Sequence, residues 1–97
     1  GYKYILTDLD GKVLEVNKGN LLTSRTVFDD LYPGMRYLVY EATGQTKVQA
    51  GAMIGSAEGT LSSGVEVLTP VVDTNYKILY DEADHPAGGR PIRLCRA

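Results

Sequence analysis

Several residue types are scarce in this chain, and each scarcity excludes a class of protein. A single cysteine, Cys95, excludes an intrachain disulfide. No stretch approaches the roughly 20 apolar residues of a membrane-spanning helix, so no membrane span is expected. The ten Lys and Arg residues do not exceed the twelve Asp and Glu residues, and the formal net charge is −2. Without a basic excess to neutralise phosphates, nucleic-acid binding is not expected.

The composition that is present fits a small folded domain. The chain has 97 residues, of which 43% are hydrophobic. This length allows one core and leaves no room for a separate catalytic lobe. We therefore expect a single domain over residues 1–97.

Short runs rich in β-branched and aromatic residues recur along the chain and predict β-strands. Turn residues separate these runs, most clearly Asp10-Gly11 and Pro33-Gly34. At most one helical turn is expected, within residues 51–61, where glycines weaken a helix. The pattern predicts an all-β sandwich of about seven or eight mainly antiparallel strands. The segments expected as strands are residues 2–7, 12–16, 25–28, 37–42, 47–52, 65–69, 76–80 and 91–95.

The Pro33-Gly34 pair predicts a sharp turn between two of these strands. Proline presets φ for the second position of a turn, and glycine accepts the positive φ that a type II turn needs next. Packing positions flank the turn on both sides. They are Phe28, Leu31, Tyr37 and Val39.

One motif resembles an enzyme site. The run Ile5-Leu6-Thr7-Asp8-Leu9-Asp10-Gly11 resembles the first motif of haloacid-dehalogenase-type phosphatases. That resemblance implies Asp8 as nucleophile and Asp10 as general acid/base, with Mg²⁺ shielding the phosphate. Lys12 stands where the family has threonine, and no helical pattern for an α/β core follows. We favour a hairpin turn, and predict no catalytic residue and no cofactor.

Metal and nucleophile sites were also considered. Asp8, Asp10 and Gly11 suggest a calcium loop, but its sixth and twelfth positions would be Val13 and Gly19 instead of glycine and glutamate. A looser calcium site that adds Asp29 or Asp30 is the alternative to a solvated turn, which we favour.

The only histidine, His85, cannot build a multi-histidine metal site. A dyad of His85 with Cys95 or a serine is the nucleophilic alternative, and we favour a loop histidine and a small apolar cysteine on the last strand.

Two further patterns favour structure over binding. Gly51, Gly55 and Gly59 have a small-xxx-small spacing, which we interpret as a loop or as closely packed strands. Arg90, Arg93 and Arg96 flank the last strand. Residues three apart face opposite sides of a strand, so these arginines predict a charged edge strand and no basic patch.

The seven tyrosines could line a glycan-binding or protein-binding surface. Six of them fall in predicted strands, where tyrosine is favoured for packing. Tyr32, at the turn, is the one expected to be exposed. The six are Tyr2, Tyr4, Tyr37, Tyr40, Tyr76 and Tyr80.

Two resemblances rest on the turn. Leu31-x-Pro33-Gly34-x-x-Tyr37-x-Val39 is similar to a signature of fibronectin type III domains, which implies a Tyr37 hydroxyl bonded back to the main chain. With Asp10-Gly11, residues 27–40 (Val-Phe-Asp-Asp-Leu-x-Pro-Gly-x-x-Tyr-x-Val-Tyr) also resemble transthyretin-like modules of bacterial surface proteins and fimbrial subunits. Both imply an immunoglobulin-like or transthyretin-like sandwich.

These resemblances imply a non-catalytic structural or adhesive module of a bacterial surface, fimbrial or phage-tail protein. Such a module acts by protein binding or by spacing, through strand edges or loops. The expected partner is another protein or a neighbouring domain of the same chain. A glycan-binding or small-ligand-binding β-domain is the alternative. The expected location is extracellular, at the cell surface or in a virion, and a cytoplasmic location stays open.

Overall fold

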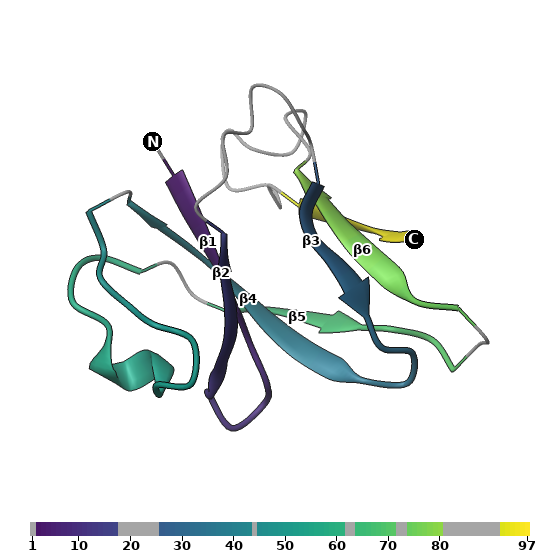
Figure 1. Ribbon diagram of the computed structural model, residues 1–97, viewed down its shortest axis with the longest axis horizontal. Helices are drawn as coiled ribbons and strands as arrows, with labels where there is room; N and C mark the ends of the chain where they lie inside the picture. Colours follow the sequence, from purple (N-terminus) through teal and green to yellow (C-terminus); the bar gives the residue numbers. More distant parts are fainter. Residues whose placement is uncertain (1, 18–25, 44, 62–63, 72–73, 81–91) are drawn as a thin grey trace. The chain divides into compact units, whose positions relative to one another are not determined.

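The structure, a computed structural model, describes residues 2–17, 26–43, 45–61, 64–71, 74–80 and 92–97. Over these residues the chain forms seven strands and one turn of 3-10 helix (Figure 1). Their bounds are β1 Tyr2–Thr7, β2 Val13–Asn17, β3 Thr26–Leu31, β4 Arg36–Thr43, η1 Ile54–Ser56, β5 Val65–Leu68, β6 Tyr76–Tyr80 and β7 Ile92–Arg96. Three residues named in predictions above, Gly19, His85 and Arg90, lie outside the described residues, as do the first positions of the predicted strands 25–28 and 91–95.

The strands are antiparallel and form two sheets. A four-stranded sheet of order β2-β1-β4-β5 belongs to a unit made of Gly1–Lys18 and Arg36–Leu68. A three-stranded sheet of order β3-β6-β7 belongs to a unit made of Gly19–Met35 and Thr69–Ala97. The predicted all-β, sandwich-like fold of mainly antiparallel strands is confirmed. The single domain and the immunoglobulin-like or transthyretin-like kinship stay predictions.

In the first unit, β1 and β2 form the hairpin that Asp10-Gly11 predicted (Figure 1). Gly11 has a φ of +89°, and its N–H donates to the Asp8 carbonyl at 3.1 Å. Period-two alternation directs Ile5 and Val13 into a core that Ala42 of β4 completes. The partly buried residues that pack against this core are Val16, Tyr40, Val48, Ile54 and Leu61.

The prediction of a strand over residues 47–52 is wrong. Lys47 forms only an isolated bridge, in which its N–H donates to the Glu58 carbonyl at 2.8 Å. Gly51 takes a φ of +91° and turns the chain, so that its N–H donates to the Val13 carbonyl at 2.8 Å. The expected helical turn within residues 51–61 is confirmed as η1.

Gly51 and Gly59 lie in a loop, as the first of the two interpretations held, whereas Gly55 lies in η1. Open space surrounds Gly51 and Gly55, since a Cβ there would meet no atom within 4 Å. At Gly59 a Cβ would lie 2.7 Å from Thr46 Oγ1. Close packing therefore requires a glycine at only one of the three positions.

In the second unit, β3 is longer than predicted and irregular. It runs to Leu31 instead of ending at residue 28. Its register with β6 shifts twice, between Thr26 and Phe28 and again between Phe28 and Leu31. Asp30 lies in the second shift with a φ of +57°. The buried apolar residues of this unit are Val27, Phe28, Leu31, Tyr76, Ile78 and Ile92.

The tyrosines are distributed largely as predicted. Tyr4, Tyr37 and Tyr76 are buried, and Tyr40 is half-buried. Tyr32 is exposed, as expected. The packing roles predicted for the four residues that flank the turn are confirmed by their burial. The Tyr37 hydroxyl bond stays a prediction.

Candidate interaction surfaces

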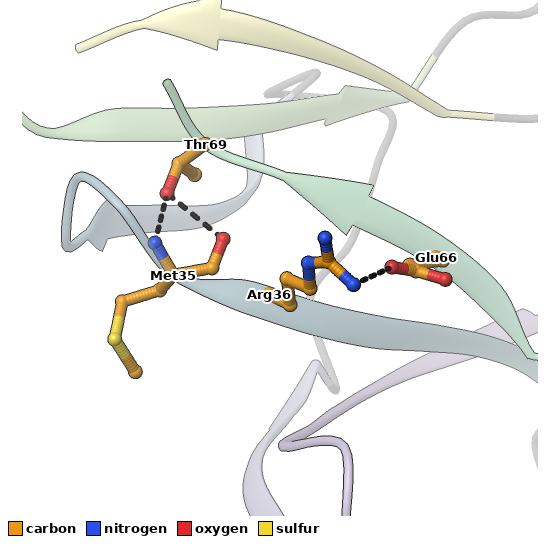
Figure 2. Close-up of polar contacts among 4 residues, drawn as sticks. All are labelled: Met35, Arg36, Glu66 and Thr69. Atoms are coloured by element: carbon orange, nitrogen blue, oxygen red, sulfur yellow. Dashed lines mark hydrogen bonds and ion pairs between the residues drawn. The ribbon is translucent and has the colours of Figure 1, made fainter. Parts of the chain in front are cut away.

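Thr69, the residue after β5, holds the turn at Pro33-Gly34. Thr69 is fully buried; its Oγ1 donates to the Tyr32 carbonyl at 2.7 Å and accepts the Met35 N–H at 2.9 Å. The main chain adds two bonds: the Thr69 N–H donates to the Met35 carbonyl, and the Gly34 N–H donates to the Thr69 carbonyl, both at 3.0 Å. Figure 2 shows Thr69 Oγ1 between the amide nitrogen and the carbonyl oxygen of Met35. Gly34 has the positive φ, +69°, that the predicted turn needs.

Three large apolar side chains around this turn face solvent. Tyr32 is 67% exposed, Met35 42% and Val71 89%. Val71 Cγ2 lies 3.2 Å from where a Cβ on Gly34 would stand, so the segment after Thr69 passes directly beside the turn. Single exposed apolar side chains are ordinary, whereas several on adjoining backbone indicate an interaction site. We call Tyr32, Met35 and Val71 the corner surface.

The two candidate phosphatase residues lie in the turn of the β1–β2 hairpin. Asp8 Oδ1 accepts the Asp10 N–H at 3.0 Å and the Lys12 N–H at 2.9 Å. This pattern is an Asx turn, in which the carboxylate takes the place of a main-chain acceptor. Asp10 is exposed. The contacts of Asp8 therefore belong to the turn, as the favoured interpretation held.

The candidate metal ligands do not gather into a site in the described part of the chain. Over those residues, no group of three or more His, Cys, Asp or Glu side chains could hold a metal ion. Asp29 and Asp30 are exposed on β3. Asp30 Oδ1 accepts a long hydrogen bond of 3.4 Å from the Asn75 amide.

The last strand has the charged edge that was predicted. In the three-stranded sheet β7 is an edge strand, and its Arg93 and Arg96 are exposed. Cys95 is half-buried in the same strand and is a free thiol. Its position agrees with the small apolar residue that the sequence predicted there.

Two shallow grooves adjoin in the first unit and share Val48 and Gln49. One has a volume of about 360 Å³ and lies between residues 14–16 of β2 and residues 48–50. The other has a volume of about 300 Å³ and includes Lys47, Ser56 and Glu58. No tyrosine lines either groove. The glycan-binding or protein-binding surface of tyrosines considered from the sequence stays a prediction.

Neither the role of Thr69 nor that of Asp30 was predicted from the sequence. Thr69 is hydrogen-bonded to Met35 and Tyr32, which lie 34 and 37 positions earlier in the chain. No local sequence pattern predicts hydrogen bonds over such a separation. The residue type gives a weak indication of the left-handed backbone at Asp30, because aspartate tolerates positive φ more readily than most residues do.

Comparison of the chain with protein-family models, curated proteins and solved structures finds no match. Among the described residues, no helix has the length and apolar character needed to cross a membrane. The resemblances to fibronectin type III and transthyretin-like modules stay predictions.

Proposed function

We propose that this chain is a non-catalytic protein-binding module, structural or adhesive, of a bacterial surface, fimbrial or phage-tail protein. The observation that carries the proposal is the corner surface, which exposes Tyr32, Met35 and Val71 on a hydrogen-bonded turn. Tyrosine and methionine are enriched at protein interfaces. Thr69 already fixes the backbone beneath them, so a partner would lose little entropy in ordering this surface.

The partner we propose is another protein or a neighbouring domain of the same chain. Site-specific photo-cross-linking in the cells that produce the protein tests this. A photoreactive residue at position 32 should give a discrete adduct, while one at Leu9 should not. Leu9 is also exposed, at 52%, but lies in the β1–β2 turn. Equal cross-linking from both positions, or none from position 32, would reject the corner surface.

The non-catalytic part of the proposal has its own test. Phosphatase activity with Mg²⁺ is measured on the wild type and on Asp8→Asn. Because the Asp8 carboxylate accepts two main-chain N–H groups of its own turn, we expect neither protein to show turnover above buffer. Activity in the wild type that disappears in Asp8→Asn would overturn the proposal in favour of an enzyme.

Glycan or small-ligand binding is the second candidate, and the adjoining grooves favour it. Lys47, Gln49 and Glu58, which line one groove, offer donors and acceptors that suit a polar chain of sugar units. Saturable binding on a glycan array that Gln49→Ala weakens, and that Tyr32→Ser leaves unchanged, would support it. Lack of saturable binding to any arrayed glycan would reject the glycan form.

A further inference from the structure

The two sheets have four edge strands, and three of these carry features that hinder pairing with another strand. β2 is bonded to a loop, because the Val13 N–H donates to the Ala52 carbonyl and the Val13 carbonyl accepts the Gly51 N–H, both at 2.8 Å. β3 is interrupted by its two register shifts. β7 exposes Arg93 and Arg96. Covering loops, bulges and edge charges are the usual means by which edges avoid added strands.

The fourth edge strand, β5, is regular. Its register with β4 runs without a shift from Val65 opposite Val39 to Leu68 opposite Arg36. Among the described residues, the main chain of β5 has no hydrogen bond beyond its pairing with β4. β5 is therefore the edge that can accept another strand.

The outward groups of β5 follow from the alternation of an antiparallel ladder, in which every second residue bonds to the neighbouring strand. The Thr69 N–H donates to the Met35 carbonyl, which marks Thr69 as a bonding position. Two and four residues earlier, Val67 and Val65 are bonding positions toward β4. Glu66 and Leu68 then direct their N–H and C=O groups away from β4.

The side chains of β5 define what an added strand must carry. Val67 is buried and Val65 half-buried on one face, whereas the Glu66 side chain is 54% exposed and Leu68 55% on the other. A basic residue opposite Glu66 would complement its charge, and apolar residues would extend the valine face. On the β4 side Leu38 is opposite Glu66, and Arg36 is its diagonal neighbour, with Nη1 3.7 Å from Glu66 Oε1 (Figure 2).

A second copy of the chain fits this edge less well. Antiparallel pairing of β5 with itself through its outward groups places Glu66 opposite either Leu68 or Glu66 of the other copy. In the first arrangement the apolar Leu68 gives the carboxylate no charge partner beyond Arg36 of its own chain, and the second opposes like charges. The charge of the edge therefore favours a different chain.

We propose that the outer edge of β5 is a strand-addition site for an extended segment of a partner protein, in which apolar residues alternate with Lys or Arg. This strand-addition site rests on the proposed protein-binding function and specifies the class of partner. The site lies on β5 and includes no residue of the corner surface. A Tyr32→Ser protein should consequently bind such a segment as the wild type does, so failure of either surface can be recognised separately.

Titration of the ¹⁵N-labelled full chain tests the proposal. The probe is a blocked peptide in which valine alternates with lysine, and the matched control has glutamate in place of every lysine. The lysine peptide should shift the amide signals of residues 65–68 and slow hydrogen exchange at Glu66 and Leu68. It should bind roughly fivefold or more tightly than the glutamate peptide at low salt, and lose this advantage at high salt.

Charge reversal is the decisive variant. Glu66 and Arg36 are both exposed, so Glu66→Lys should fold normally while its preference changes to the glutamate peptide. Equal binding of both peptides, an unchanged preference in Glu66→Lys, or shifts confined to another edge strand would overturn the proposal. Concentration-dependent shifts at β5 without peptide would overturn it in favour of a second copy.

Discussion

At the scale of single residues, the corner depends on one hydroxyl group. Thr69→Val keeps the shape of the side chain but leaves the Met35 N–H and the Tyr32 carbonyl without this partner. We expect the free energy of unfolding to fall by about 2 kcal/mol, the typical cost of buried groups left unsatisfied. Denaturant titration measures it.

The control for this change is Thr69→Ser, which keeps the hydroxyl and loses a methyl group. It should cost about 1 kcal/mol, the usual cost of one buried methyl. If serine destabilises as much as valine, packing holds the corner and the hydrogen bonds described here do not.

Asp8 makes a similar local contribution to the β1–β2 turn. Asp8→Ala removes the acceptor of two main-chain N–H groups, so we expect a loss of about 1 kcal/mol. Asp10→Ala, in the same turn but exposed, should change stability by less than about 0.5 kcal/mol. Thermal and denaturant unfolding of both variants would show the difference. Equal effects would mean that the Asp8 carboxylate does not support the turn.

The glycines of the two turn dipeptides were predictable, and residues with distant partners were not. Gly11 and Gly34 follow residues typical of turns, and both have the positive φ that these turns need. Thr69 stands in a strand-like run before Pro70, where threonine is ordinary. Its burial and its hydrogen bonds depend on a turn far earlier in the chain, so the sequence around Thr69 does not predict them.

At the scale of elements, β3 shows how one residue sets the regularity of a strand. Asp30 occupies left-handed backbone in a bulge, a position at which glycine is favoured. Asp30→Gly should change the free energy of unfolding by less than about 0.5 kcal/mol, because relief of about 1 kcal/mol of strain offsets the flexibility that glycine gives the unfolded chain. The lost 3.4 Å bond from Asn75 is too long to add much to the change.

Asp29→Gly is the matched control, since Asp29 is equally exposed and is not among the residues with positive φ. It should lower stability by about 0.5–1 kcal/mol through the flexibility of glycine in the unfolded chain. Equal losses from both substitutions, measured by urea titration, would show that the bulge does not strain Asp30.

Strands were predictable where a turn signal and a β-rich run stand together. The β1–β2 hairpin and the start of β4 follow from Asp10-Gly11 and Pro33-Gly34. Residues 47–52 have a strand-like composition, but Gly51 turns the segment toward Val13 instead. Period and composition cannot show which neighbour a segment will bond, so the candidate surfaces were less predictable than the strands that carry them.

At the scale of the whole molecule, exposed sheet edges are the usual places where copies of a chain pair and aggregate. The arginines of β7 place positive charge on an edge that would otherwise present Leu94 and Cys95, both only half-buried. Added strands at such an edge would have to bury or oppose these charges. The charges of β7 therefore protect this edge against the pairing of copies, whereas β5 lacks such protection.

Arg96→Val should make the protein aggregate at a lower temperature, because the edge gains a β-branched apolar residue and loses a charge. The control is Arg36→Val, which removes the same charge from an exposed position on β4, a strand with neighbours on both sides. Light scattering during a heating ramp, compared with the unfolding transition of each variant, separates aggregation from lost stability. Because β4 has no free edge, Arg36→Val should aggregate only as it unfolds, whereas Arg96→Val should aggregate before unfolding. If both variants aggregate at the same point of their unfolding transitions, net charge and not edge protection keeps the chain dispersed.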